Sequence, residues 1–474
     1  MTAMNLPLIL LRVKGGLLAV GLLGACAHAA GSDAAAAPHS AAALPQPTAP
    51  HASGPLQRVV LVTVDGLTPE TYLHPDAHGL AVPTLRRLVR EGAYADGARS
   101  VFPTNTYPAH TSIASGTTPL KHGIVANRIF DPFGNNQDAF YWYAEDIRVP
   151  PLWELARRAG LSSAIVHWPV SVGARVDWLV PEFWRARQPE DLKLVRALST
   201  PGLLDEVQRE QPDLYERLVP PTDSATVDIV LHLLRHRRPN LVLAHISQVD
   251  RAQHEQGVWS PAALAAIENA DAQLGRLLQA IDALGIASET ALVVASDHGF
   301  TNVTRLVNPG ALLREGGLLT LDAQQKLSSY RATLANWGGL SHVYAREGED
   351  EAALEGELRA LFEARRAQPN SGIARVYGRD ELRARGGDGR AVLAVEAERG
   401  VYFGTGLTEY EGTPTSRGMH GHDPDRPEMQ ASLLWLAPGV RPGLRQGTQL
   451  VDIAPTVARW LGLTLEGADG RALD

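Results

Sequence analysis

Apolar and polar positions follow two alternating patterns along the chain from Arg58 onward. Nearly continuous apolar runs predict strands, which we place at 58–64, 163–170, 240–249, 291–296 and 431–438. Apolar residues at helical spacing predict helices, which we place at 83–92, 151–160, 224–237, 261–285 and 452–462. Continuous apolar runs are typical of strands buried on both faces. The pattern therefore predicts a doubly wound α/β fold whose mostly parallel sheet has helices on both faces.

A different pattern fills the region from about 301 to 415, where short strand-like and helix-like stretches follow one another. Examples are "SHVYAREGEDEAALEGELRALFEARRA" and "GIARVYGRDELRARG". They predict a small α+β subdomain inserted into the main fold. We therefore expect one catalytic domain over 56–474, with 301–415 as its inserted subdomain.

The N-terminal residues have the layout of a secretory signal. Arg12 and Lys14 precede an apolar run, 15–25, that is too short to span a bilayer well. The run ends in "LGAC", where Cys26 is the only cysteine of the chain and resembles the lipidated residue of a bacterial lipoprotein signal. Ordinary cleavage after "AHA", 27–29, is the alternative. Either reading predicts an exported protein without an internal disulfide.

An Ala- and Pro-rich stretch follows this signal and lacks the large apolar residues that a core needs. We predict a lipoprotein-type signal peptide at 1–26 and a flexible tether at 27–55. The expected location is the periplasm or, through a lipid anchor, a bacterial membrane.

Composition adds limits on the size of the fold and on its partners. The chain has 474 residues, of which 45% are hydrophobic, so it is long enough to bury a large core. Its formal net charge is −8 and it has no long basic run. The charge gives no electrostatic case for a nucleic acid as a stable partner. The sequence does not predict the oligomeric state.

Ionisable residues follow three of the predicted strands, and two histidines precede a fourth. They are Asp65, then Asp250 with His254, then Asp297 with His298, and finally His420 and His422. The carboxyl ends of parallel strands meet at one edge of a sheet, so we expect these side chains to converge. Carboxylates and imidazoles together bind zinc and related divalent ions. Each motif alone also fits a turn or a solvated pair, and Asp65–Gly66 is a common strand-ending turn.

A segment rich in hydroxyl groups, 101–132, adds a candidate for anion binding. It contains Thr104, Thr106, Thr111 and Ser112, and Pro108 suits the first turn of a short helix that would end at Gly116. A hydroxyl at a helix N-terminus lies beside free N–H groups and suits an anion. Helix capping is the alternative role for these threonines.

Taken in order, these segments resemble the alkaline phosphatase superfamily, and within it the nucleotide pyrophosphatase/phosphodiesterase family. The resemblance runs from about Arg58 to the C-terminus and rests on "VDG", "FPTNTYPAHTSIASG", "KHGIVANRIFDP", "HISQVDRAQHEQG", "SDHGF" and "RGMHGHDPDRPEMQASLLW". It implies an alkaline phosphatase-like fold and a site that holds two zinc ions.

The resemblance also implies a role for each matching residue. One zinc ion would be held by Asp250, His254 and His420. The other would be held by Asp65, Asp297 and His298, and would touch the hydroxyl of Thr106. Thr106, which precedes Tyr107 and Pro108, matches the nucleophile. Asn127 matches the asparagine that binds the phosphoryl oxygens, and Tyr107 matches an aromatic that can stack on the substrate.

The implied activity is metal-dependent hydrolysis of phosphodiester or pyrophosphate bonds in nucleotide-like small molecules, through a threonine-phosphoryl intermediate. A phosphomonoesterase with the same metal core is the main alternative. A sulfatase would need a cysteine at the nucleophile position, and a non-catalytic surface lipoprotein would be expected to lack a ligand or the nucleophile.

The chain departs from the family pattern at three places. Ala109–His110 stands where Asn–His is common, and His422 stands where an aromatic follows His–Gly; we do not count His422 as a ligand. "WPVS", 168–171, has valine for glycine, which leaves the base preference open. Trp178, Phe183 and Trp184 either line the pocket or pack in the core.

Overall fold

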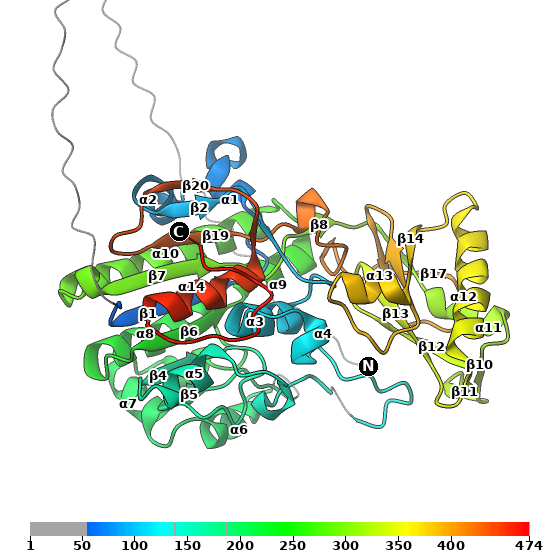
Figure 1. Ribbon diagram of the computed structural model, residues 1–474, viewed down its shortest axis with the longest axis horizontal. Helices are drawn as coiled ribbons and strands as arrows, with labels where there is room; N and C mark the ends of the chain where they lie inside the picture. The colour runs from blue at the N-terminus through cyan, green and yellow to red at the C-terminus, as the bar shows by residue number, and fades with distance from the viewer. Residues whose placement is uncertain (1–54, 137–138, 186–187, 474) are drawn as a thin grey trace, which may run out of the picture. The chain divides into compact units, whose positions relative to one another are not determined.

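The computed structural model describes residues 55–136, 139–185 and 188–473 (Figure 1). The predicted signal peptide and all but the last residue of the predicted tether lie outside these residues. Among the helices described, none is both long and apolar enough to cross a membrane.

An eight-stranded sheet forms the centre of the fold, in the order β20-β2-β19-β7-β1-β6-β4-β5. Only β19 runs antiparallel to its neighbours, so the mostly parallel sheet is confirmed. The strands are β1 (Arg58–Val64), β2 (Ala93–Ala95), β4 (Ser163–Val166), β5 (Trp178–Val180), β6 (Leu241–Ile246), β7 (Thr290–Ala295), β19 (Leu433–Leu436) and β20 (Gly443–Arg445).

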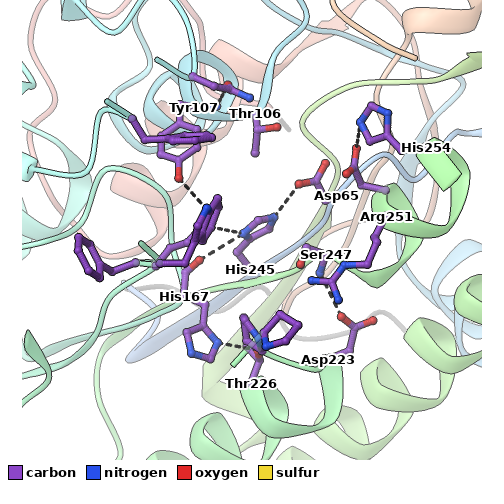
Figure 2. A pocket seen from close by; sticks show the side chains of 18 of the residues that line it. Asp65, Thr106, Tyr107, His167, Asp223, Thr226, His245, Ser247, Arg251 and His254 are labelled. Atoms are coloured by element: carbon purple, nitrogen blue, oxygen red, sulfur yellow. Dashed lines mark hydrogen bonds and ion pairs between the residues drawn. The ribbon is translucent and has the colours of Figure 1, made fainter. Parts of the chain in front are cut away.

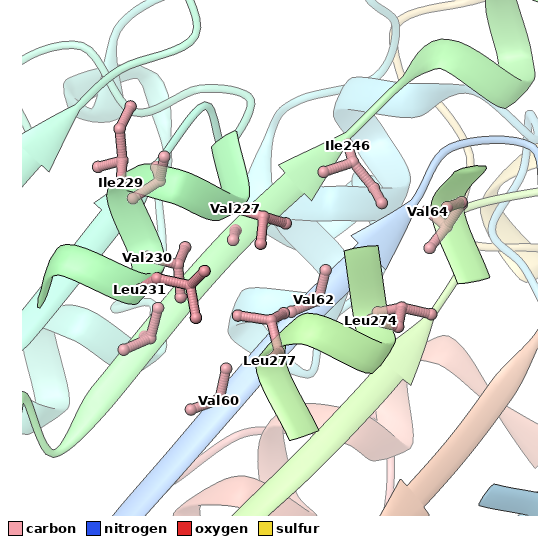
Figure 3. Close-up of a cluster of buried hydrophobic side chains, with 14 of the residues drawn as sticks. Val60, Val62, Val64, Val227, Ile229, Val230, Leu231, Ile246, Leu274 and Leu277 are labelled. Carbon is pink, nitrogen blue, oxygen red and sulfur yellow. The ribbon is translucent and has the colours of Figure 1, made fainter. Parts of the chain in front are cut away.

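Helices cover both faces of this sheet, and β1 shows how (Figure 1). Val60, Val62 and Val64 pack with one set of helices, and Figure 3 shows them beside Leu274 and Leu277. This set comprises α2 (Pro83–Glu91), α7 (Leu203–Glu210), α8 (Asp223–His236) and α10 (Pro261–Ala283). The alternate residues Val59 and Leu61 pack on the other face with α3 (Thr106–Ser115), α5 (Leu152–Arg158) and α14 (Ile453–Trp460). Burial on both faces explains why the strand is apolar at every position.

Short elements complete this part of the chain. They are α1 (Glu70–Leu73), α4 (Pro119–His122), α6 (Asp191–Leu198), α9 (Gln248–Gln256), and the strand pairs β3 (Ala98–Arg99) with β21 (Thr448–Gln449) and β8 (Thr301–Asn302) with β18 (Gly418–Met419).

The region predicted as an α+β insertion forms separate small sheets with a hydrophobic cluster of its own. Its antiparallel sheet has the order β12 (Ala332–Asn336), β13 (Leu340–Ala345), β15 (Leu393–Ala397), β14 (Ile373–Gly378). Around it lie α11 (Pro309–Glu315), α12 (Glu351–Arg366), α13 (Arg379–Ala384), β9 (Arg305–Val307), β10 (Leu319–Leu321), β11 (Leu327–Tyr330), β16 (Val401–Phe403) and β17 (Glu411–Gly412). The domain boundaries at 301 and 415 stay a prediction.

Two predicted strands, 163–170 and 431–438, are half as long as expected. β4 ends at Val166 because His167 and Val170 take positive φ angles of 53° and 56°. Pro169 between them has no N–H to give to a sheet. An apolar run alone does not reveal such a backbone turn.

Candidate active site

The carboxyl ends of the three central strands bring the predicted acidic residues together. Asp65 directly follows β1, Asp297 lies two residues beyond β7, and Asp250 lies in α9, which follows β6. Gly66 takes a φ of 70°, and its N–H donates to Asp297 Oδ1 at 3.1 Å. The Asp–Gly turn therefore ends the strand and also links two candidate ligands.

Asp65, Asp297 and His298 form one candidate metal group. Their ligand atoms lie within 4.8 Å of one another, and all three residues are buried. His298 Nε2 is 3.3 Å from Asp65 Oδ1 and 3.1 Å from Asp297 Oδ2. This is the group that the resemblance assigns to the nucleophile-side ion.

Asp250, His254 and His420 form a second group, again with ligand atoms within 4.8 Å of one another. Asp250 Oδ1 is 3.3 Å from His254 Nε2 and 3.7 Å from His420 Nε2. The two groups are adjacent, because the imidazole rings of His298 and His420 are stacked with centroids 3.7 Å apart.

The three histidines are oriented as metal ligands would be. Each Nδ1 lies within hydrogen-bond distance of a backbone carbonyl: His254 with Gly418 at 3.0 Å, His420 with Thr104 at 2.9 Å, and His298 with Gly299 at 3.1 Å. A neutral imidazole that donates from Nδ1 presents a lone pair at Nε2. All three Nε2 atoms are the ones that face the carboxylates.

The carboxylates complete the fit to a metal. Asp65 Oδ1, Asp250 Oδ1 and Asp297 Oδ2 are buried and have no hydrogen-bond partner among the described residues. A buried carboxylate oxygen without a partner is costly, and a bound cation would remove that cost. Three carboxylates with three imidazoles fit zinc and related ions.

Burial also sets the protonation of the site. Burial raises the pKa of Asp65 well above its usual value, and the charges of Asp297 and Asp250 raise it further. Burial lowers the pKa of His298 to about 4 and that of His420 to about 3, so both rings are neutral at pH 7. His254 differs, because Asp250 raises its pKa although burial opposes this; an ion bound there would have to displace that proton, whereas His298 and His420 can bind an ion as they stand.

The predicted nucleophile lies beside the first group. Thr106 is the first residue of α3, and its hydroxyl is 3.5 Å from His298 Nε2. Figure 2 shows Thr106, Asp65 and His254 gathered at one end of the pocket. Asn127 is tied to the same helix turn, because its Oδ1 accepts a hydrogen bond of 2.9 Å from the Tyr107 N–H.

Thr104, the other candidate hydroxyl, forms hydrogen bonds that hold a neighbouring loop in place. Its Oγ1 donates to the His422 carbonyl at 3.0 Å and accepts from the Gly421 N–H at 3.0 Å. Together with the bond from His420 Nδ1 to the Thr104 carbonyl, these contacts hold the loop that carries His420.

The same loop is held from its other side by the turn between β12 and β13. The Gly339 N–H donates to the His420 carbonyl at 2.9 Å. Gly421 takes a φ of 89°, and a Cβ atom there would lie 1.8 Å from the Trp337 carbonyl oxygen. Only glycine fits at this position, so residues of the 301–415 region fix the backbone of a candidate ligand.

His245 and Glu182 are site residues that the sequence analysis missed. His245, in β6, lies between two carboxylates, with Nε2 3.1 Å from Asp65 Oδ2 and Nδ1 2.9 Å from Glu182 Oε2. Burial opposes protonation of His245, but these two carboxylates raise its pKa well above its usual value. The contact leaves Asp65 Oδ1 facing the candidate metal position. A lone histidine inside the run "LVLAHI" was the available signal.

A cavity of about 390 Å³ opens next to Thr106 and both groups. Phe140, Phe183 and Trp184 line it, while Trp178 packs against the core instead. Tyr107 also lines it but is only 1% exposed, and its hydroxyl donates to Glu182 Oε1 at 2.9 Å.

His110, which follows the departure at Ala109, and His422 are both buried outside the metal groups. His110 is within hydrogen-bond distance of the Thr63 hydroxyl and the Thr106 carbonyl, each at 2.8 Å, and its ring packs edge-on against Trp168. His422 is fully buried and belongs to neither group.

The sheet order, the two carboxylate–imidazole groups and the threonine beside them define a protein with an alkaline phosphatase-like fold and a candidate hydrolytic metal centre. The profile of the type I phosphodiesterase/nucleotide pyrophosphatase family matches residues 59–423, and the chain belongs to this family.

Relatives and solved structures agree with this assignment. Human ectonucleotide pyrophosphatase/phosphodiesterase family member 5 is 23% identical over 424 residues, which are 86% of this chain and 75% of that protein. Mouse family member 1 is 26% identical over 248 residues, 51% of this chain, and the match spans only 24% of that longer relative.

Two solved structures share the fold. The structure of human ectonucleotide pyrophosphatase/phosphodiesterase 5 has a TM-score of 0.63 at 21% identity and covers 87% of this chain and 97% of its own. A murine counterpart, an inactive variant with a threonine replaced by alanine and in complex with AMP, has a TM-score of 0.60 at 20% identity with the same coverage.

Proposed function

We propose that the protein hydrolyses phosphodiester or pyrophosphate bonds of nucleotide-like small molecules through a phosphoryl intermediate on Thr106. The observation that carries this proposal is the Thr106 hydroxyl, which lies 3.5 Å from His298 Nε2 of the first carboxylate–imidazole group, in a residue that lines a cavity with aromatic walls. Family membership supports the reaction class. The murine neighbour is an inactive variant in which a threonine is replaced by alanine, and it was solved in complex with AMP. It supports a threonine nucleophile and a nucleotide substrate for this protein.

Two zinc ions would occupy the site in this proposal. The residues that would hold them are Asp65, Asp297 and His298 for one, with the Thr106 hydroxyl, and Asp250, His254 and His420 for the other. When bound, the ions would supply the charge that lowers the pKa of a hydroxyl nucleophile and stabilises the phosphoryl and leaving oxygens.

The chain's own residues then position and stabilise the reacting group. Thr106 Oγ1 attacks phosphorus and displaces the leaving oxygen, and water later releases the phosphoryl group. Because Asn127 Oδ1 accepts from the Tyr107 N–H, its amide nitrogen is the part that can donate to a phosphoryl oxygen. Thr106 is the first residue of α3, so the positive end of the helix dipole lies at the same place.

A base or aryl group of the substrate would lie against the aromatic wall of the cavity. Phe140, Phe183 and Trp184 are partly exposed there, so we propose that they provide the stacking surface. Tyr107, buried and anchored on Glu182, supports this wall from behind.

A phosphomonoesterase is the second candidate, and Arg251 is the observation that favours it. Arg251 lines the same cavity, and a cation there would attract the second negative charge of a monoester. The aromatic wall favours the diester reading, because a monoester of a small alcohol would leave it empty.

A substrate panel tests these alternatives. The zinc-loaded protein should hydrolyse bis-p-nitrophenyl phosphate and the p-nitrophenyl ester of thymidine 5′-monophosphate faster than p-nitrophenyl phosphate, measured as kcat/KM. The nucleotide diester should be the best of the three because it fills the aromatic wall. Preference for the monoester would replace this proposal by the monoesterase, and no turnover at full metal content would favour a non-catalytic protein.

We further propose that the protein is exported and anchored to a bacterial membrane through Cys26. The support is the signal-like sequence at 1–26, and the relatives are named as ecto-enzymes. A Cys26→Ala variant should move from the membrane fraction to the soluble exported fraction. An unchanged distribution would favour cleavage after 27–29 or another mode of attachment.

A further inference from the structure

A third group of metal-binding side chains lies away from the candidate active site. Glu210 ends α7, and His232 and His236 lie in the last part of α8; their ligand atoms are within 4.8 Å of one another. Thr226, near the other end of α8, lines the substrate cavity. Ten residues of helix separate it from His236, a distance of about 15 Å. The group is therefore separate from the catalytic centre.

The two imidazoles converge on one carboxylate oxygen. His232 and His236 are four residues apart and share one face of α8. His232 Nδ1 and His236 Nε2 are each 2.9 Å from Glu210 Oε1. Two nitrogens and one oxygen thus surround a single position between α7 and α8.

A second carboxylate fixes the orientation of His232. Its Nε2 is 3.2 Å from Glu206 Oε2, and the same oxygen accepts a hydrogen bond of 2.6 Å from Arg237. A neutral His232 that donates from Nε2 to Glu206 has its lone pair on Nδ1, facing Glu210. In that tautomer, two lone pairs face each other across 2.9 Å, and a cation between them would relieve the repulsion; in the other tautomer, Nδ1 donates to Glu210 and no ion is needed. A carboxylate on the far nitrogen of a histidine is the usual support of a metal ligand.

Exposure makes the position reachable by an ion. The side chain of His232 is 5% exposed, whereas those of Glu210 and His236 are 35% and 46% exposed. One ligand is therefore held in place by packing and two are open to solvent. Water would complete the coordination of an ion bound there.

We propose that Glu210, His232 and His236 bind a transition-metal ion of the zinc class, which joins α7 to α8. Two imidazoles and one carboxylate favour zinc and exclude a preference for calcium or magnesium, which take oxygen ligands. The segment between the two helices includes Leu218 and Pro221, which line the substrate cavity. An ion at this position stabilises the helix pair on either side of that cavity wall.

Calorimetric titration of the metal-loaded protein with ZnCl2 tests the site. The expected result is one zinc ion bound per chain beyond the catalytic ions, and loss of that ion in a His236→Ala variant. His236 is half-exposed at a helix end, so this variant is expected to fold. His74→Ala is the matched control. Like His236, His74 pairs with a glutamate, in its case Glu70 at 3.1 Å, but His74 belongs to none of the three metal groups found among the described residues.

Thermal unfolding provides a second, independent measurement. Added zinc should raise the Tm of the parent protein and the His74→Ala variant, and should leave the Tm of His236→Ala unchanged. No extra ion in the parent protein, or equal binding by His236→Ala, would overturn the proposal. Either result would identify the group as histidines hydrogen-bonded to Glu206 and Glu210 without a metal ion. Because the two experiments measure zinc binding and Tm rather than turnover, they are independent of the catalytic activity.

Discussion

Replacing Thr106 by alanine should reduce hydrolysis of the nucleotide diester by at least about 10³-fold, the scale of loss seen when a covalent nucleophile is removed. The metal content should not change, because six other side chains form the two groups. The physical reason is position: the hydroxyl lies at the N-terminus of α3, 3.5 Å from His298. The measurement is kcat/KM together with bound zinc per chain.

Two threonines provide matched controls for this experiment. Thr111 is one turn further along α3 and donates to the Tyr107 carbonyl at 2.9 Å, so Thr111→Ala should keep most of the activity. Thr106→Ser should retain a fraction of the rate, since it keeps a hydroxyl. A near-normal rate in Thr106→Ala, combined with an inactive Thr104→Ala, would transfer the nucleophile role to Thr104.

Removing the metal with EDTA should abolish activity, and adding zinc back should restore it. Without ions, one buried oxygen each of Asp65, Asp250 and Asp297 has no hydrogen-bond partner among the described residues. We therefore expect the metal-free protein to have a lower Tm as well as a rate reduced by at least about 10³-fold. Measured zinc content must fall with the activity; full activity in protein shown to be metal-free would contradict the proposed centre.

Single substitutions separate the two groups. Asp297→Asn and Asp250→Asn should each lower the zinc content by about one ion per chain, because each residue belongs to only one group. Glu255→Gln is the control: Glu255 is exposed and lines the same cavity, but it lies in neither group. It should bind both ions. Loss of both ions in Glu255→Gln would mean that the assigned ligands are incomplete.

The central part of the fold was predictable because burial determines its sequence. β1, β6 and β7 are apolar at nearly every position, and the acidic residues after them stand where parallel strands expose their carboxyl ends. That logic predicted that Asp65, Asp250 and Asp297 would converge. It could not predict β5 or β20, which have three residues each and no pattern of their own.

The sequence could not predict contacts between side chains that lie far apart along the chain. His245 looks like one polar residue in a buried strand, and Glu182 is 63 residues away from it along the chain. Their pairing depends on how β6 lies relative to the loop after β5. The group of Glu210, His232 and His236 was missed for the same reason, because Glu210 is supplied by a different helix.

The turn at Trp337 to Gly339, which holds the His420 backbone, limits how this protein can be altered or can evolve. A region that only covered a binding pocket could be shortened or exchanged between relatives without loss of chemistry. Here the Gly339 N–H and the Trp337 carbonyl fix the loop of a candidate ligand. If the proposed function holds, changes in this region alter the position of a metal ligand as well as the pocket, and the region is not an exchangeable module.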